Sequence, residues 1–381
     1  MSLTNGNSRG TLFGMRGGAI CNFGTLTVMS SNISNNTAIE NGGGIYNENG
    51  TVIVRDTTFD NNSVTGNTGI GGGGGGGFYT NFGTFELTGS TVSNNTVMNF
   101  GGGIFLINGT VMINNSTISG NSANGIEGAS GGIENMNATL NVSNSTITNN
   151  RAINDSINNG GGIWSNSSTT IRNTIVAGNS VVNTESAPDI RVVRGMFVSN
   201  GNNLIGNTTN MGAAIAFQST DIINQNARLT PLGNFGGTTK THSLFANSPA
   251  IDKGDAAINT DQRGMMRPID NPNVTNASDG SDIGAFEASL NPTAARVVVS
   301  GKIMSSNGRG IAKTVVSMTD EDGNVRRATT SAFGIYSFAD VSISGIKIFT
   351  VINKRFSFVE TLIVRSIIEN TDDVNFTTTH R

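Results

Sequence analysis

Few residues of this sequence have the types and spacing that chemistry on a substrate requires. In the first half of the chain the tightest cluster of charge is Arg55, Asp56 and Asp60. Paired carboxylates beside a cation could perform acid and base catalysis on a uronic glycan, often with Ca²⁺. Alternatively, these side chains point outward near the ends of a strand and are solvated. We favour the second interpretation and assign no catalytic residue.

A second group of charged residues lies in the later part of the chain. Acidic side chains could gather there around Ca²⁺, but their spacing does not match an EF-hand loop, and neighbouring arginines could pair with them instead. The group comprises Asp252, Asp255, Asp261, Asp282, Arg263 and Arg267. We predict clamps between carboxylates and guanidinium groups, with no cofactor-binding or metal-ligating residue and Ca²⁺ as the alternative cofactor.

Histidine and lysine are too scarce to favour a histidine-based mechanism or a zinc site. The two histidines are His242 and His380, and lysine is absent before Lys240. We predict a structural role for His242. Alternation directs the ring of Trp164 outward, either as a platform for a sugar or, as we favour, packed under the preceding loop. Cys21, the single cysteine, is predicted to be a small buried apolar side chain rather than a reactive thiol.

An internal repeat determines the elements that must position these side chains. A Gly-Gly-apolar unit recurs with steps of 25, 33, 26, 29 and 30 residues between its apolar members. These members are Ile20, Ile45, Phe78, Ile104, Ile133 and Ile163. Each is followed by an Asn/Gly turn and by apolar residues spaced by two, which is typical of strands with one buried face. We predict three short strands in each unit, joined by Gly and Asn that tolerate left-handed backbone angles.

One such coil cannot bury its own apolar face, so the coils must stack. Stacking places equivalent positions about 4.8 Å apart, where a repeated charge would face its own sign. The charged share of only 13% agrees with this geometry. The predicted fold is therefore all-β, with a right-handed parallel β-helix. The glycines at 71–77 are followed by Phe78 rather than by a lysine, so we predict a lengthened turn and not a phosphate-binding loop.

Three regions follow from these patterns. They are the parallel β-helix repeats at 1–205, the end of the solenoid with a cap at 206–290, and, after a linker at 291–295, a β-sandwich at 296–381. In the last region glycine is rarer, and residues 321–324 carry a hairpin signal between alternating strands. The sequence contains no run of 18 apolar residues, so we predict no membrane span. A secretion signal is missing from its start, and we expect residue 1 to lie inside a longer native protein.

Several motifs resemble those of bacterial surface proteins. The Gly-Gly-Ala-Ile element at 17–20 and the Phe-Asp-Asn-Asn element at 59–62 resemble the repeats of polymorphic outer-membrane proteins. Farther on, the strings Asn-Leu-Ile-Gly, Asn-Phe-Gly-Gly-Thr-Thr, Ser-Pro-Ala-Ile-Asp, Asp-Gln-Arg-Gly and Asp-Ile-Gly-Ala-Phe-Glu occur in order. This segment resembles the choice-of-anchor Q domain of bacterial surface proteins.

The final segment contains Val-Ser-Gly-Lys-Ile at 299–303 and Thr-Ser-Ala-Phe-Gly-Ile-Tyr-Ser-Phe at 330–338. It resembles the carboxypeptidase regulatory-like, transthyretin-like β-sandwich. Together the resemblances imply an exported bacterial protein at the cell surface or outside the cell. They bring no shared catalytic residues.

Three functions agree with the sequence. The first is a structural or adhesive surface protein, not an enzyme, whose β-helix faces contact glycans or neighbouring proteins. The second is a polysaccharide lyase or glycoside hydrolase of the pectate-lyase-like type. The third is an extracellular subunit that forms homo-oligomers through end-to-end pairing of strands. Nucleic acid is not an expected partner, because the formal net charge is -3.

Overall fold

The computed structural model describes residues 1–8, 15–66, 73–125, 129–212, 215–288, 296–321, 323–342, 346–367 and 370–379. Gly71, Gly72, the linker at 291–295, Asp322 of the hairpin signal and His380 lie outside the described residues. Two compact units are present. The first comprises Met1–Arg228, Gly236–His242 and Ser248–Ala288, and the second comprises Leu229–Phe235, Ser243–Asn247 and Ser289–Arg381.

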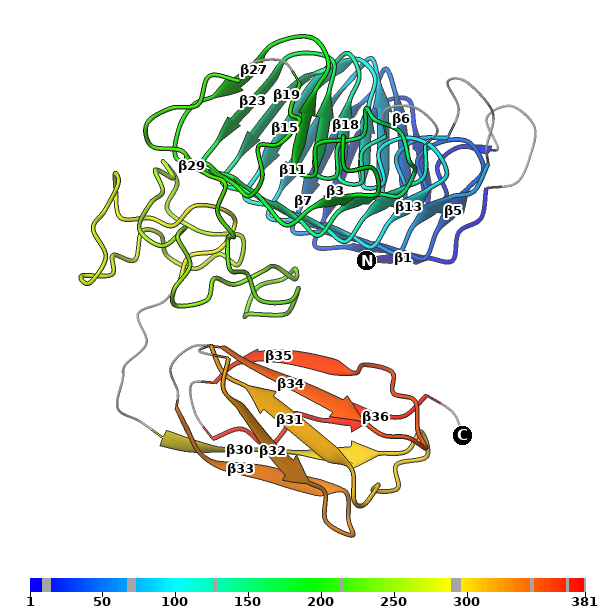
Figure 1. Ribbon diagram of the computed structural model, residues 1–381. Helices are drawn as coiled ribbons and strands as arrows, with labels where there is room; N and C mark the ends of the chain where they lie inside the picture. The colour runs from blue at the N-terminus through cyan, green and yellow to red at the C-terminus, as the bar shows by residue number, and fades with distance from the viewer. Residues whose placement is uncertain are drawn as a thin grey trace. The chain divides into compact units, whose positions relative to one another are not determined.

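Regular structure in the described ranges is all β, which confirms the predicted fold class. In these ranges no helix is long and apolar enough to cross a membrane. The first unit is a parallel β-solenoid of about seven coils, and Figure 1 shows the strands of successive coils side by side.

Four parallel sheets run along the solenoid. The first sheet contains β2 (Ile20–Asn22), β6 (Ile45–Glu48), β10 (Phe78–Asn81), β14 (Ile104–Leu106), β18 (Ile133–Asn135), β22 (Ile163–Ser165) and β26 (Ile190–Val192). The second contains β3 (Thr25–Met29), β7 (Thr51–Arg55), β11 (Gly83–Thr88), β15 (Gly109–Asn114), β19 (Thr139–Ser143), β23 (Thr169–Arg172) and β27 (Phe197–Ser199).

The other two sheets consist of shorter strands. The third contains β1 (Ser2–Thr4), β4 (Asn32–Ser34), β8 (Thr58–Asp60), β12 (Thr91–Ser93), β16 (Thr117–Ser119), β20 (Thr146–Thr148), β24 (Ile175–Val176), β28 (Leu204–Ile205) and β29 (Ile222–Ile223). The fourth contains β5 (Thr37–Ala38), β9 (Ser63–Val64), β13 (Thr96–Val97), β17 (Ser122–Ala123), β21 (Arg151–Ala152) and β25 (Ser180–Val181).

The fourth sheet differs from the prediction of three strands in each coil. Its strands have only two residues, such as Ser63–Val64 of β9. Two residues are too few to show an alternating pattern in the sequence, so this strand is visible only once the coils are stacked.

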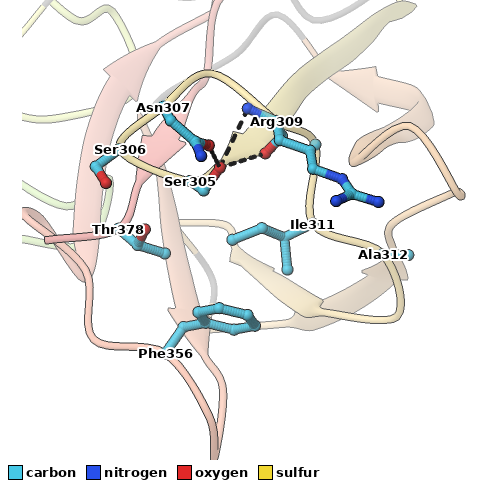
Figure 2. A pocket seen from close by; sticks show the side chains of 9 residues that line it. Ser305, Ser306, Asn307, Arg309, Ile311, Ala312, Phe356 and Thr378 are labelled. Carbon is cyan, nitrogen blue, oxygen red and sulfur yellow. Dashed lines mark hydrogen bonds between the residues drawn. The ribbon is translucent and has the colours of Figure 1, made fainter. Parts of the chain in front are cut away.

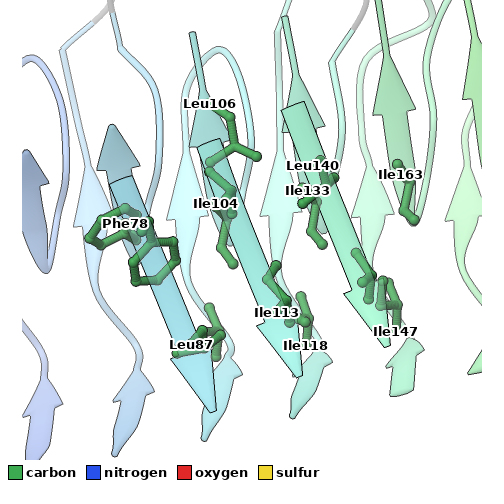
Figure 3. Close-up of a cluster of buried hydrophobic side chains, with 14 of the residues drawn as sticks. Phe78, Leu87, Ile104, Leu106, Ile113, Ile118, Ile133, Leu140, Ile147 and Ile163 are labelled. Carbon is green, nitrogen blue, oxygen red and sulfur yellow. The ribbon is translucent and has the colours of Figure 1, made fainter. Parts of the chain in front are cut away.

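Apolar side chains of equivalent repeat positions stack inside the coils. Ile45 pairs with Phe78, Phe78 with Ile104, and Ile104 with Ile133 in neighbouring strands. All four side chains are fully buried, and Figure 3 shows several such side chains between successive strands. Burying each one stabilises the stack by roughly 1.5–3 kcal/mol.

A buried ladder of asparagines runs beside this apolar core. Each side-chain amide donates to the Oδ1 atom of the asparagine in the next coil, at 2.8 to 2.9 Å. The ladder consists of Asn36, Asn62, Asn95, Asn121, Asn150 and Asn179. Buried polar groups are tolerated here because every rung provides the acceptor for the previous one.

Residues 236–242 and 248–288, called the cap below, lack long strands and pack on the side of the solenoid. The buried Gln262 joins them to the third sheet, because its Oε1 atom accepts from Thr117 Oγ1 at 2.6 Å and its Nε2 atom donates to Thr91 Oγ1 at 3.1 Å. Thr91 and Thr117 face outward from the strands, yet both are fully buried. The cap therefore covers part of one outer face of the solenoid.

The second unit contains two small sheets. One contains β30 (Arg296–Met304), β33 (Ile335–Ser342) and β36 (Phe376–Thr377), and the other contains β31 (Val315–Thr319), β32 (Val325–Thr329), β34 (Ile346–Ile352) and β35 (Leu362–Ser366). All pairs are antiparallel except β30 with β36. Buried residues of both sheets, such as Phe338 and Phe349, share one apolar core.

Candidate functional site

The acidic cluster of the first half is divided between two places. Asp56 occupies the corner between β7 and β8 with a φ of 50°, whereas Asp60 ends β8. The carboxylate of Asp60 accepts hydrogen bonds from Ser93 Oγ at 2.7 Å and Asn94 Nδ2 at 2.9 Å. Arg55 is exposed at the end of β7. The structure thus gives Asp60 a role in joining coils.

Two carboxylate–guanidinium pairs hold the cap together. Arg267 Nε lies 2.7 Å from Glu287 Oε2 with both side chains fully buried, and Arg263 Nη2 lies 2.6 Å from Asp261. The partner of Arg267 is thus Glu287 and not one of the aspartates that the sequence analysis predicted. Asp255 instead pairs with Arg172 of the solenoid at 2.8 Å.

The remaining two aspartates of the cap accept backbone hydrogen bonds. Asp252 accepts from the N–H of Asn271, and Asp282 accepts from the N–H of Asp252 and Ala288. Among the described residues, no group of three or more His, Cys, Asp or Glu side chains is placed so that it could hold a metal ion.

His242 and Trp164 are both buried. His242 Nε2 is hydrogen-bonded to Ser119 Oγ at 2.8 Å, which ties the cap to the third sheet. Trp164 points outward from the first sheet, and its Nε1 atom donates to the carbonyl of Asn158 in the preceding loop at 2.9 Å. Both side chains therefore serve packing within the first unit.

The prediction for Cys21 was wrong, because its side chain is exposed. Cys21 is the central residue of β2 and pairs with Tyr46, which faces outward from the first sheet. Partial burial raises the pKa of the Cys21 thiol, although the charge of Arg16 opposes the shift. This shift favours the thiol over the nucleophilic thiolate.

Aromatic rings line the outer face of the first sheet in successive coils. The rings of Tyr46 and Tyr79 are stacked with centroids 5.0 Å apart, and Phe105 meets Tyr79 edge-on at 5.6 Å. All three are almost completely buried. In the next coil the same position is occupied by Glu134.

Glu134 is a fully buried carboxyl group. Its Oε2 atom accepts from the N–H of Gly101 at 2.9 Å and of Ser130 at 3.2 Å, and in the described residues Oε1 finds no hydrogen-bond partner. Burial raises its pKa well above the usual range, which favours the neutral form. A neutral carboxyl can occupy a position that neighbouring coils fill with Phe105 and Trp164.

Two exposed phenylalanines flank this row at the corner between the first and second sheets. Phe23 is 53% exposed and meets Tyr46 edge-on at 6.2 Å, and Phe82 is 61% exposed. Phe23 precedes Phe82 by two coils, a rise of roughly 10 Å at the spacing of stacked strands. We define the corner site as Arg16, Phe23, Glu48, Asn81, Phe82 and Asn108.

The backbone of Phe82 has a conformation that a bulky residue rarely adopts. Its φ is 52°, in the left-handed region. At the equivalent position of the preceding coil, Asn49 has a φ of 56°, and asparagine accepts such angles readily. Phenylalanine is strained there by roughly 1–3 kcal/mol. Since the side chain is largely exposed, burial does not offset this cost.

Polar groups form a continuous hydrogen-bonded row beside the two rings. Asn108 Nδ2 donates to Asn81 Oδ1 at 3.0 Å, and Asn81 Nδ2 donates to Glu48 Oε1 at 3.0 Å. The hydroxyl of Tyr46 donates to Glu48 and accepts from Arg16 Nη1. Burial and the hydrogen bond to Glu48 raise the pKa of Tyr46, which keeps the hydroxyl protonated as a donor.

This arrangement combines apolar ring faces with fixed amide, carboxylate and guanidinium groups. Sugars present the matching chemistry, because their C–H faces pack on aromatic rings and their hydroxyls hydrogen-bond to planar polar groups.

No protein family matches the sequence. The curated proteins also contain no similar sequence.

Phe82 was not singled out from the sequence. The corresponding turn reads Asn-Gly at 49–50 and at 108–109, whereas it reads Phe-Gly at 23–24 and at 82–83. Aligning the repeats at this turn would have shown that an asparagine is replaced by a large apolar residue where asparagine is conformationally favoured.

Proposed function

We propose that this protein is an exported bacterial surface protein whose solenoid binds glycan chains at the corner site. The observation that carries the proposal is the strained and exposed Phe82. Strain that packing does not offset is a reason to look for function at a residue. Binding at Phe82 would offset the strain in the complex, because the ring would then be covered by the ligand.

The geometry favours an extended and uncharged glycan. Corresponding positions of the corner repeat about every 4.8 Å along the stack, so a long ligand could contact several coils. Arg16 pairs with Glu40 at 2.8 Å, and Glu48 adds a second carboxylate nearby, so the corner has no excess positive charge that would attract an anion. The supported ligand class is therefore a neutral polysaccharide lying along the corner.

Replacement of Phe82 by asparagine tests this proposal. Asn49 shows that asparagine fits this turn with nearly the same φ, so we expect Phe82→Asn to be at least as stable as the parent protein. Loss of ring stacking should weaken binding to neutral β-linked glucans, mannans or xylans roughly three- to tenfold. Binding is measured on immobilised polysaccharides, and stability by thermal unfolding.

Phe333→Ser provides the matched control, because Phe333 is 75% exposed and belongs to the second unit. Unchanged binding by Phe82→Asn would exclude the corner site. Release of new reducing or unsaturated sugar ends during the assay would instead favour the lyase or hydrolase function. Export is tested separately by protease treatment of intact cells that express the full gene.

End-to-end assembly is a second candidate, favoured by incomplete burial at the first coil. Leu3, Ile20 and Leu26 are only partly buried, whereas Val52, which pairs with Leu26, is fully buried. A further coil from another chain could cover them. Light scattering over a range of concentrations should show association, and a strictly monomeric protein would exclude this assembly.

A further inference from the structure

A pocket of about 400 Å³ lies at one end of the second unit. Its lining consists of Ser305, Ser306, Asn307, Arg309, Gly310, Ile311, Ala312, Phe356 and Thr378. Figure 2 shows the ring of Phe356 across the pocket from Ser305 and Asn307. This volume is in the range of small-molecule binding sites.

The polar wall of the pocket is a turn held by its own hydrogen bonds. The N–H of Ser305 donates to the carbonyl of Arg309 at 2.8 Å, and the N–H of Arg309 donates to Ser305 Oγ at 3.1 Å. These bonds keep the turn closed and leave Ser306, Asn307 and Arg309 exposed at the rim. The backbone of the turn is therefore positioned before a ligand arrives.

Two polar side chains of the pocket have unused hydrogen-bonding capacity. Thr378 is only 4% exposed, and among the described residues its Oγ1 atom has no protein partner. The guanidinium of Arg309 likewise forms no ion pair or hydrogen bond with the part of the chain that the structure describes. A ligand in the pocket can therefore form a hydrogen bond with Thr378 Oγ1 and an ion pair with Arg309.

Basic residues adjoin the pocket lining along the chain. Lys313 follows Ala312, and Lys354 and Arg355 precede Phe356. None of the nine lining residues is acidic. The electrostatic environment therefore favours an anionic ligand.

We propose that this pocket binds a uronate, a sugar that carries a carboxylate. The carboxylate pairs with Arg309, whose planar guanidinium suits bidentate binding. The sugar hydroxyls bond to Thr378, Ser306 and Asn307, and the apolar sugar face packs on Phe356 and Ile311. The three hydroxyl-bearing side chains of the lining favour a sugar over a peptide carboxylate. This inference is independent of the corner site.

Titration calorimetry on the full chain with glucuronate, galacturonate and glucose tests the proposal. We expect a uronate to bind at least tenfold more tightly than glucose. Arg309→Gln should weaken uronate binding tenfold or more, and Thr378→Val should weaken it about threefold. Arg327→Gln is the matched control, because it removes the same charge from the same unit at an exposed residue that does not line the pocket.

Methyl NMR of Ile311 reports whether the ligand enters the pocket. A shift of this methyl on addition of uronate, lost in Arg309→Gln, supports the site. Failure of both uronates to bind at millimolar concentration would overturn the proposal, as would equal effects of Arg309→Gln and Arg327→Gln. Tighter binding of a short peptide through its C-terminal carboxylate would show that the ligand is a peptide and not a sugar. Phe82→Asn should leave uronate binding unchanged.

Discussion

Asn179 donates both its main-chain N–H and its side-chain amide to the same oxygen, Oδ1 of Asp189, at 3.1 and 2.9 Å. The asparagine ladder therefore ends at a carboxylate. Asn203 has the same relationship with Asp221, at 2.9 and 3.0 Å. A carboxylate suits the last position because it accepts hydrogen bonds without needing another acceptor beyond it.

Asp189, the carboxylate at the end of the ladder, should make the free energy of unfolding depend on pH. Burial raises the pKa of Asp189 from 3.8 to about 6, although hydrogen bonds from Asn179 oppose the shift. The folded state then binds the proton more tightly than the unfolded state. This contribution to stability is complete below about pH 4 and is lost as the pH rises to about 6, a difference of about 2–3 kcal/mol.

Asp189→Asn should remove this part of the pH dependence. Urea unfolding of both proteins between pH 4 and pH 7 measures the difference in slope. Parallel stability curves for the two proteins would show that Asp189 titrates normally in the fold.

Asn121 tests the interior of the ladder. It accepts from the N–H and the amide of Asn95, at 3.0 and 2.9 Å, and donates to Asn150 Oδ1 at 2.8 Å. Asn121→Leu should cost several kcal/mol in the free energy of unfolding, since each buried group left unpaired costs about 1–3 kcal/mol. Asn141→Leu, at an exposed position of β19, is the control and should change little. Similar losses in both variants would contradict the role of the ladder.

Gly102 and Gly24 differ in the space around them, so they test how tightly the coils are stacked. A Cβ atom on Gly102 would lie 2.4 Å from the carbonyl oxygen of Gly131, whereas one on Gly24 would meet nothing within 4 Å. We expect Gly102→Ala to lower the melting temperature strongly or to prevent folding, and Gly24→Ala to be nearly neutral. Thermal unfolding followed by circular dichroism is the measurement. A neutral Gly102→Ala would show that the coils are more loosely stacked than described.

Gln262 should hold the cap on the solenoid. Gln262→Ala removes its hydrogen bonds to Thr91 and Thr117 and leaves buried hydroxyls without these partners. We expect limited proteolysis to cut the cap several times faster while the solenoid core stays resistant. Gln225→Ala, at an exposed residue, is the control. Equal cleavage rates in the two variants would place the anchoring elsewhere.

Much of the solenoid could be predicted because its signals are local. The Gly-Gly-apolar units and the apolar residues spaced by two identify the parallel stack, since only stacking can bury the same face in every coil. The pairing of Ile104 with Ile133 follows directly from the repeat. The two-residue strands of the fourth sheet were missed because no pattern can show in two residues.

Individual side-chain environments were harder to predict. Cys21 and Tyr46 occupy the same position in neighbouring coils, yet Cys21 is exposed and Tyr46 is buried. The strand pattern does not distinguish them, because the difference depends on which later or earlier segments cover each coil.

The sequence by itself determined the class of fold and the buried positions of the repeat, because periodicity is written in every coil. Only the tertiary structure decided that Asp189 ends the ladder, that Glu287 pairs with Arg267 and that Phe82 stands strained at an exposed corner. Each of these features depends on residues from different segments meeting at one point. These contacts depend on the stacking of the coils and on the packing of the cap, and no local sequence pattern predicts them.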